Sequence, residues 1–192
     1  TDAAYENFAA TTGELWRFKL GETSSDSYSD AIFALGNIDA KGNFLPPDGR
    51  SMAIHKGNQL WHTDMSFYPR RGEFSFLLSR VIPETGGETE LCDTRVAYEG
   101  LSAERKKLVD GLFAYHSLQA SRAKTGFTDL NEDHKKAKPV LRPLVHVHDG
   151  SGRRALYLAS HIGLIEGYSE AESAALLEDL VAEASARERL YI

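Results

Sequence analysis

The sequence predicts a mainly β fold of the α+β class, in which two layers of antiparallel strands are flanked by helices. Many short segments rich in β-branched and aromatic residues alternate with turns that contain Gly, Pro, Asn or Asp. Fewer segments show apolar residues at helical spacing. A chain of 192 residues is about one domain in length. We therefore expect a single domain over residues 1–192.

The first part of the chain is expected to form a helix and two strands. Residues 3–12 have apolar residues at helical spacing and end before Gly13. Three side chains of this helix are expected to face inward: Tyr5, Phe8 and Ala9. Alternation over 15–20 predicts a short strand, and the apolar run 31–38 predicts a buried one. Turn residues follow at 39–43 and 46–49.

A strand pair and two helices are expected next. The segment 74–81 is strongly β-prone, and 89–93 would be its partner across the turn 83–87, where Pro restricts φ and Gly permits positive φ. Residues 95–101 have the pattern of a helix. A second helix is expected from 102 to about 112, with Ser102 as its N-cap.

The last part of the chain is expected to contain strands around a hairpin and one long helix. Strands are predicted at 113–118 and 140–147, and the second returns at 155–158 through the turn Gly150-Ser151-Gly152. The polar segment 119–138 between them is expected to be a mobile loop insertion.

The long helix is expected to begin at Ser169, which forms a capping box with Glu172, and to run to about residue 183. Its apolar stripe would consist of Ala174, Leu177, Leu180 and Val181. Residues 190–192 resemble the opening of another strand.

Composition limits the partners. The net charge of −6 argues against nucleic acid, because phosphate binding needs clustered cations. No apolar run approaches the ~20 residues of a membrane-spanning helix, and the first residues lack the features of a signal peptide. Cys92 is the single cysteine, which excludes an intramolecular disulfide and suits a small buried apolar residue. We therefore expect a cytoplasmic protein without nucleic-acid or membrane partners.

The most informative pair of the sequence is His62 and Asp64. In an extended strand, residues two apart point to the same face, so this imidazole and this carboxylate would lie side by side. Two His and one carboxylate form the facial triad of non-haem Fe(II) sites, which leaves positions open for a cosubstrate and oxygen. Taken alone, a His-x-Asp pair is more often a solvated polar pair on a strand than a metal site, so the surrounding motifs carry the argument.

Three ordered motifs resemble the TauD/TfdA family of Fe(II)- and 2-oxoglutarate-dependent dioxygenases. They read Asn58-x-x-Trp61-His62-x-Asp64-x-x-Phe67, then Pro83-x-x-Gly86-Gly87-Glu88-Thr89 with Ala97-Tyr98-x-x-Leu101-Ser102, and finally the run from Arg142 to Tyr157. The family usually has Pro at the position of Asp149. The resemblance covers nearly the whole chain and implies a cupin-like double-stranded β-helix, or jelly roll, that is incomplete at the C-terminus.

The resemblance implies that His62 and Asp64 are Fe(II) ligands. The family's third ligand is a His after a Trp-Asp-Asn-Arg-like run, and a later Arg binds the distal carboxylate of 2-oxoglutarate. Neither segment occurs before Ile192, so we expect a fragment that lacks parts at both ends, with the third His beyond Ile192. The implied cofactors are Fe(II), 2-oxoglutarate as cosubstrate and O2, with ascorbate as a reductant. Structural or surface roles are assigned to His55, His116, His134, His146 and His148.

Five further residues are candidates for cosubstrate or substrate contacts. Thr89 matches the family threonine that hydrogen-bonds a 2-oxoglutarate carboxylate, and Asn58 matches a position that lines the pocket. Their simpler interpretations are a strand residue and a turn amide. His161 is either a substrate contact or a strand-end histidine. Lys19 and Lys41 fall near lysines of TfdA-like members that would bind a substrate carboxylate, and are otherwise surface lysines.

The implied activity is hydroxylation of a C–H next to a heteroatom in a small anionic substrate. The runs 90–98 and 150–154 resemble TfdA-like members more than taurine dioxygenase. An aryloxyalkanoate such as 2,4-dichlorophenoxyacetate is therefore expected, giving a phenol, glyoxylate, succinate and CO2. The alternatives are a taurine, alkylsulfonate or alkyl sulfate dioxygenase of the same family and, from another class, a non-catalytic cupin-like binding domain or an inactive truncation. Assembly into a homo-oligomer, a dimer or a tetramer, is also expected.

Overall fold

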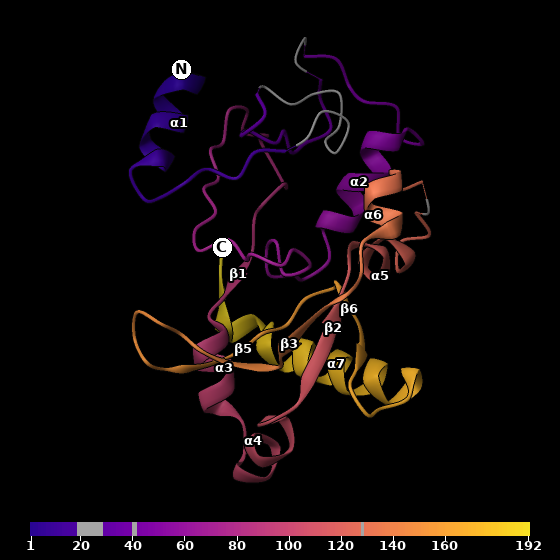
Figure 1. Cartoon of the computed structure of the whole chain (residues 1–192). Helices are drawn as coiled ribbons and strands as arrows, with labels where there is room; N and C mark the ends of the chain where they lie inside the picture. Colours follow the sequence, from indigo (N-terminus) through magenta and orange to yellow (C-terminus); the bar gives the residue numbers. More distant parts are fainter. Residues whose placement is uncertain (19–28, 40–41, 128) are drawn as a thin grey trace.

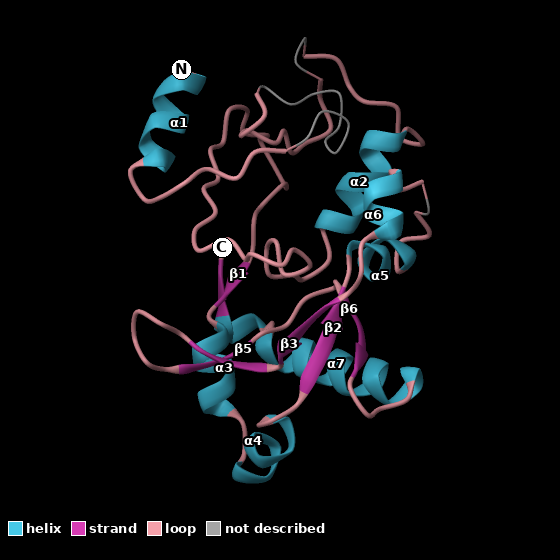
Figure 2. Cartoon of the chain, viewed as in Figure 1, coloured by secondary structure: helices cyan, strands magenta, loops and turns pink. Residues whose placement is uncertain are grey.

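Seven α-helices and three small antiparallel sheets make up the part of the chain that the computed structural model describes, which is residues 1–18, 29–39, 42–127 and 129–192. Helices cover more of these residues than strands do, so the molecule is mixed rather than mainly β. The paired strands run antiparallel, as the sequence predicts. Residues before 91 are mostly loops, whereas the strands and the longest helix come later in the chain (Figures 1 and 2).

The largest sheet has three strands in the order β3-β2-β6: β3 (Val140–Pro143), β2 (Phe113–His116) and β6 (Ile162–Ile165). Ala114, in the central strand, pairs with Arg142 on one side and with Ile165 on the other. Ala114 and Ile165 are fully buried, so this sheet contributes one face to the core. The sequence predicts β2 and β3, but β6 is not predicted.

Two further sheets have two strands each. β4 (Val145–Val147) and β5 (Arg154–Leu156) form the predicted hairpin. Gly152 in its turn has φ of +67°, which glycine adopts without steric cost. The single strand expected over 140–147 is divided at the buried Leu144 between β3 and β4, which belong to different sheets. β1 (Leu91–Cys92) pairs with β7 (Leu190–Tyr191), after the 3-10 turn η1 (Arg187–Arg189).

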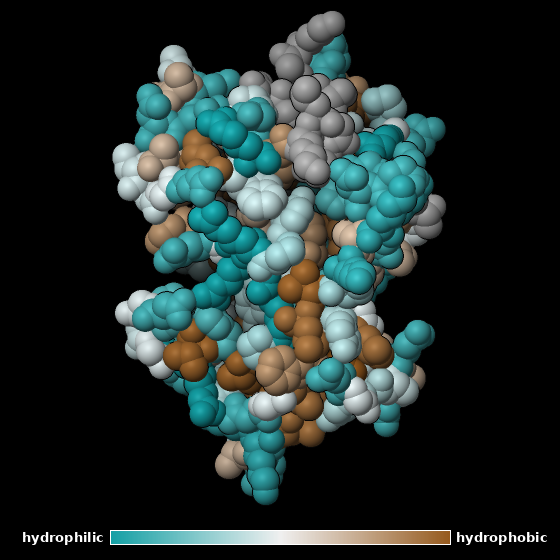
Figure 3. All heavy atoms as spheres, in the orientation of Figure 1, coloured by the Kyte–Doolittle hydropathy of each residue, from teal (hydrophilic) through white to brown (hydrophobic). Residues whose placement is uncertain are grey.

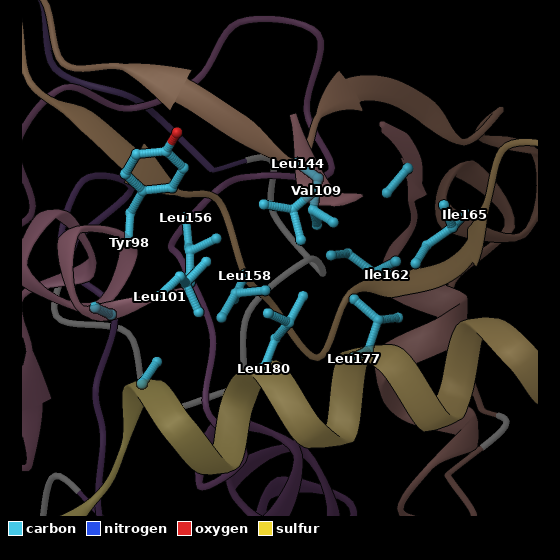
Figure 4. Packing of buried hydrophobic residues seen from close by; sticks show 13 residues of the cluster. Tyr98, Leu101, Val109, Leu144, Leu156, Leu158, Ile162, Ile165, Leu177 and Leu180 are labelled. Carbon is cyan, nitrogen blue, oxygen red and sulfur yellow. The ribbon is translucent and has the colours of Figure 1, made fainter. Parts of the chain in front are cut away.

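Three helices enclose the hydrophobic core against the sheets: α3 (Thr94–Gly100), α4 (Ala103–Val109) and α7 (Glu170–Ala184). In Figure 4, Leu180 and Leu177 rise from α7 toward Leu158 and Ile162. Every residue of this core cluster lies between Ala97 and Ala184, and Cys92 is partly buried against it. The packed centre of the molecule is therefore formed by the later half of the chain.

The helix starts read from the sequence are confirmed for α4 and α7. The Ser169 hydroxyl accepts a hydrogen bond from the Glu172 amide at 3.3 Å, and the Glu172 carboxylate accepts one from the Ser169 amide at 2.9 Å, which completes the capping box. Ser102 caps α4 in the same manner. The buried stripe of α7 differs from the predicted one, since Ala174 is exposed. It consists of Ser173, Leu177, Leu180 and Ala184.

The first helix, α1 (Asp2–Ala10), forms where expected, but the expectation that it buries an inward face is wrong. None of Tyr5, Phe8 and Ala9 is buried, and Phe8 is 58% exposed. The helix is held by a hydrogen bond of 2.6 Å from the Tyr5 hydroxyl to the Phe76 carbonyl and by an edge-on contact between Phe8 and Phe76.

Three short helices occur where none was predicted: α2 (Arg50–Asn58), α5 (Leu118–Ala123) and α6 (Glu132–Lys136). The last two lie within the segment 119–138 or begin next to it, so the loop expected there is in part helical. Ser117 and Asn131 cap α5 and α6 through their side chains. The side-chain amide of Gln119, in α5, donates a hydrogen bond of 2.6 Å to the backbone carbonyl of Lys135, in α6, and so connects the two helices.

Two β-prone segments in the first half do not form the strands expected of them. Residues 31–38 contribute only an isolated bridge between Ile38 and Phe44, and no strand of the described chain pairs with 74–81. The reason is that a strand needs a neighbour for its backbone groups and a cover for its apolar face. Leu77 and Ile82 remain 62% and 81% exposed. The strand expected over 15–20 is absent over 15–18, and residues 19 and 20 lie outside the described chain.

The surface combines hydrophilic side chains with scattered apolar ones. Figure 3 shows hydrophobic atoms among predominantly hydrophilic ones in the lower half of the view. Over the described residues, no helix has the length and apolar character needed to span a bilayer.

Candidate metal centre

His62 and Asp64 lie side by side, as the sequence predicts, although not on a strand. Residues 61–63 belong to no helix or strand, and residues 64–67 form a turn. The His62 Nε2 atom lies 3.1 Å from the Asp64 Oδ1 atom, and the two side chains keep 26% and 54% of their exposure. Trp61 is half-buried, and its carbonyl accepts a hydrogen bond from the Ser160 amide at 2.9 Å.

The separation of these two atoms suits a shared metal ion. Ligand atoms that each lie about 2.1 Å from a metal and form a right angle at it are about 3.0 Å apart. The observed 3.1 Å between His62 Nε2 and Asp64 Oδ1 is close to that value. One imidazole nitrogen and one carboxylate oxygen are also donors that Fe(II) accepts. The residues present therefore fit two adjacent positions of a divalent metal site.

The orientation of the His62 ring is set by the backbone. Its Nδ1 atom lies 2.6 Å from the Leu60 carbonyl oxygen, so Nδ1–H donates there and Nε2 is directed to Asp64. A hydrogen bond from the second ring nitrogen to a carbonyl is the usual way in which a ligating histidine is held. The Leu60 carbonyl thus fixes the tautomer in which Nε2 is unprotonated and could ligate a metal.

The electrostatics of the pair favour opposite charges. The hydrogen bond with Asp64 raises the pKa of His62, although burial opposes the rise. The same hydrogen bond lowers the pKa of the Asp64 carboxyl, again against burial, and the Ser75 hydroxyl assists. A divalent cation would take the place of the proton between the two side chains, so metal binding at this pair would release a proton.

The turn that contains Asp64 is held in place by hydrogen bonds with Leu158 and with Arg142. Met65 has φ of +56°, which reverses the chain directly after Asp64. The Thr63 hydroxyl donates to the Leu158 carbonyl at 2.8 Å. The Arg142 guanidinium, on β3, donates to the carbonyls of Ser66 at 2.8 Å, of Tyr68 and of Pro69. The sheet therefore positions the loop that carries His62 and Asp64, which are called the metal pair below because they are the candidate ligands. The position of Arg142 in the sequence did not indicate this role.

His161, a predicted substrate contact, lies beside the pair and is 5% exposed. Its ring is 5.8 Å from the His62 ring and 4.6 Å from the Phe67 ring, between centroids. Its Nδ1 atom is 3.1 Å from the buried Ser66 hydroxyl. Burial, together with the nearby His62, lowers the pKa of His161 to about 3, so the ring is neutral.

Asn58 is joined to a residue that sequence reasoning missed, Arg122. Asn58 is the last residue of α2, and its Oδ1 atom accepts a hydrogen bond of 2.9 Å from the Arg122 Nη2 atom. Arg122, on α5, is only 7% exposed. Its guanidinium lies against Gly57, where an added Cβ atom would be 1.9 Å from Nη1. Gly57 thus leaves space for the buried Arg122 guanidinium next to Asn58, the first residue of the motif that contains His62 and Asp64.

The structure does not test the roles of the other predicted site residues. Thr89 is exposed in the segment 81–90, and Lys19 and Lys41 lie outside the described residues. Within the described part of the chain, no third His, Cys, Asp or Glu completes a metal-binding cluster with His62 and Asp64. The roles of Thr89, Lys19 and Lys41 therefore stay predictions.

Comparison with known proteins identifies relatives over nearly the whole chain. The family model described as "Taurine catabolism dioxygenase TauD, TfdA family" matches residues 3–191. The "Alpha-ketoglutarate-dependent 2,4-dichlorophenoxyacetate dioxygenase" of Cupriavidus pinatubonensis is 37% identical over 176 residues, which are 91% of this chain and 58% of the relative. The "(S)-phenoxypropionate/alpha-ketoglutarate-dioxygenase" of Sphingobium herbicidovorans is 36% identical over 82% of this chain and 58% of the relative.

A solved structure is similar as well. The "Crystal structure of AAD-2 in complex with Mn(II) and N-oxalylglycine" superposes with a TM-score of 0.76 and 42% identity, over 81% of this chain and 58% of that one. The chain thus spans under three fifths of the length of each of these relatives. On the family match over residues 3–191, the chain belongs to the TauD/TfdA family of dioxygenases.

Proposed function

We propose that this chain supplies two of the three protein ligands of an Fe(II) centre in a 2-oxoglutarate-dependent dioxygenase. The observation that carries the proposal is the 3.1 Å separation of His62 Nε2 and Asp64 Oδ1, with the other ring nitrogen held by the Leu60 carbonyl. The third ligand would be a His in residues that follow Ile192. The "Mn(II) and N-oxalylglycine" complex of the similar structure supports a metal and an oxoacid at the same place, because N-oxalylglycine differs from 2-oxoglutarate by an NH in place of a CH2.

The reaction proposed is hydroxylation of a C–H bond next to a heteroatom. When bound, Fe(II) would supply the activation of O2, coupled to oxidative decarboxylation of 2-oxoglutarate to succinate and CO2. The chain's own contribution is to hold the two ligands, to orient His62 through Leu60, and to shield one side of the pair with the rings of Phe67 and His161. Ascorbate would serve as a reductant.

An aryloxyalkanoate is the proposed substrate, with a phenol and glyoxylate as products of an aryloxyacetate. The names of the 2,4-dichlorophenoxyacetate and phenoxypropionate relatives support this class. The second candidate is a taurine, alkylsulfonate or alkyl sulfate substrate, which the description of the matching family favours. Thr89 and Asn58 are proposed to contact the cosubstrate, and Lys19, Lys41 and His161 the substrate.

The strands are proposed to belong to a jelly roll, which similarity to a dioxygenase structure at a TM-score of 0.76 supports. Assembly into a dimer or tetramer, a cytoplasmic location and the mobility of 119–138 stay predictions.

The first experiment measures metal binding directly. Mn(II) is titrated into the 192-residue chain and free Mn(II) is followed by electron paramagnetic resonance. The variants His62→Ala and Asp64→Ala should each lose most of the affinity, because each removes one of two ligand atoms. His148→Ala is the matched control, since His148 is exposed and hydrogen-bonded to Ser151. Equal binding by all three variants would contradict the proposed ligands.

The second experiment tests catalysis. A version that includes the residues following Ile192 is assayed for succinate with Fe(II), 2-oxoglutarate and a panel of phenoxyacetates, taurine and alkyl sulfates. Succinate formation with phenoxyacetates, abolished by His62→Ala, is the expected result. Turnover with taurine alone would replace the aryloxyalkanoate by the second candidate. Metal binding without succinate from any substrate would favour a non-catalytic binding domain.

A further inference from the structure

A cavity of about 120 Å³ lies beside the loop of the metal pair. Its walls are formed by Arg71, which follows that loop, by Arg142 and Pro143 of β3, by His146 of β4 and by Tyr157, which follows β5. The cavity is several times larger than the about 10–15 Å³ that is enough to hold one water molecule on the same measure. It has room for a carboxylate or a similar group of a few heavy atoms.

The cavity walls offer hydrogen-bond donors that the protein does not use. Tyr157 is 9% exposed and contacts the rings of His116 and His146, yet over the described residues its hydroxyl has no hydrogen-bond partner. Arg142 donates through Nε and Nη2 to the carbonyls of the metal loop, which leaves Nη1 without a partner in the described chain. Both atoms are open to solvent at the cavity, so they are available to donate hydrogen bonds to a bound group.

Positive charge exceeds negative charge at the cavity. Arg71 Nη1 donates to His146 Nε2 at 2.6 Å, so the imidazole accepts and is neutral, and Arg71 Nη2 pairs with Asp149 at 2.7 Å. Burial and the neighbouring Arg71 lower the pKa of His146. The Asp149 side chain is 79% exposed, so it neutralises Arg71 from the solvent side. Two guanidinium groups therefore meet one solvated carboxylate, and Arg142 has only carbonyls as partners.

We propose that this cavity is a binding site for a small carboxylate or a comparable oxyanion, held by Arg142, Arg71 and the Tyr157 hydroxyl. Guanidinium groups bind carboxylates and oxyanions with charge-assisted hydrogen bonds that are about twice as strong as neutral ones. The site is separate from His62 and Asp64, but it shares Arg142 with the loop that carries them. Its anion is either a free ion or the carboxylate of a larger molecule that also reaches the metal pair.

The experiment uses the whole chain without metal, so that its result is independent of the proposed iron chemistry. With a chelator present and ionic strength held constant, acetate, sulfate, phenoxyacetate and 2-oxoglutarate are each titrated and followed by calorimetry. The variants Tyr157→Phe, which keeps the ring, and Arg71→Gln should weaken acetate binding about tenfold, or about 1.4 kcal/mol. The matched control is Arg153→Gln, which changes a half-exposed arginine of the hairpin that pairs with Glu99 of α3. Circular dichroism verifies that each variant is folded.

The outcomes separate the possible sources of the anion. Acetate and sulfate binding that Tyr157→Phe and Arg71→Gln both weaken supports a site for free anions. Tighter binding of phenoxyacetate or 2-oxoglutarate with the same sensitivity supports the carboxylate of that larger molecule. If no probe binds, or if Arg153→Gln weakens binding as much as Tyr157→Phe does, the proposed site is wrong, and the roles of His62 and Asp64 are unaffected.

Discussion

The Ser66 hydroxyl lies 3.1 Å from the Nδ1 atom of His161, and both residues are buried. They are 95 positions apart in the chain. This hydrogen bond joins the loop after Asp64 to the residue that precedes β6. It therefore connects the metal pair to the largest sheet.

Removing that hydroxyl is expected to destabilise the fold. Ser66→Ala leaves the buried His161 nitrogen without its partner, which costs about 1–3 kcal/mol. Urea unfolding followed by circular dichroism measures the change in the free energy of unfolding. Ser151→Ala, at an exposed hairpin turn, is the control and should change it by less than about 0.5 kcal/mol. Similar losses in both variants would show that the buried bond is not stabilising.

A methyl group at Gly57 should destabilise the fold only while the Arg122 side chain is present. Gly57 lies within α2, and an added Cβ atom would be 1.9 Å from the Arg122 Nη1 atom. Gly57→Ala alone must displace the buried guanidinium from Asn58, so we expect a loss of about 1–3 kcal/mol. In an Arg122→Ala background the obstacle is gone, and the helix preference for alanine should make the same change neutral or stabilising by about 0.5–1 kcal/mol.

Chemical unfolding of the four proteins of this cycle gives the interaction energy between the two positions. A Gly57→Ala effect of the same sign and size in both backgrounds would mean that the guanidinium moves away from Gly57 without loss.

His116 should make stability depend on pH. It is fully buried, and neither of its ring nitrogens has a hydrogen-bond partner among the residues that the structure describes. Burial, with Arg142 and Lys124 nearby, lowers its pKa from 6.5 to about 4. Between these values the unfolded chain binds a proton that the folded chain does not, so stability falls as the pH falls. The loss from this group approaches about 3 kcal/mol near pH 4 and is absent well above pH 6.5.

The variant His116→Leu removes the titrating group without removing a hydrogen bond, so it should flatten the decline of stability between pH 6.5 and 4. Unfolding by urea at a series of pH values measures the slope. His161 also has a lowered pKa and will contribute to the pH dependence of stability in both proteins. The difference in slope between the unaltered chain and His116→Leu is therefore the quantity to compare. An unchanged slope in His116→Leu would show that His116 is protonated in the folded state.

The capping box of α7 gives a prediction about helix stability. Ser169→Ala leaves the Glu172 amide at the start of a 15-residue helix unpaired. The expected loss is about 1 kcal/mol. A lowered thermal midpoint in calorimetry is the measurement, and Glu178→Ala, on the exposed side of the same helix, is the control. Equal midpoints for Ser169→Ala and the unaltered chain would contradict a stabilising cap.

The features that the sequence predicts are those with local causes. Ser169 and Glu172 define a helix start by themselves, and Gly152 defines a turn. The helix α2 was missed because it follows Gly49, which has no side chain to cap it. The segment 74–81 has high β-propensity but no described partner strand, and propensity alone does not form a sheet.

The same distinction applies to the candidate site. His62 and Asp64 are two residues apart, so their proximity follows from the local chain, even though a turn rather than a strand brings it about. The contact of Arg122 with Asn58 joins residues 64 positions apart, and that of Arg142 with Ser66 joins residues 76 apart. No local pattern indicates such partners, because they depend on how α5 and β3 are placed in the fold.

Because the buried cluster extends only from Ala97 to Ala184, the segment with His62 and Asp64 is anchored to it rather than being part of it. Amide protons before residue 91 should consequently exchange with solvent through partial opening, at a lower free energy than those of β2 and α7. On warming, such an opening would separate His62 from Asp64 while the later half of the chain still keeps its helices and strands. A metal bound at the proposed site would then be released at a lower temperature than that at which the whole molecule melts.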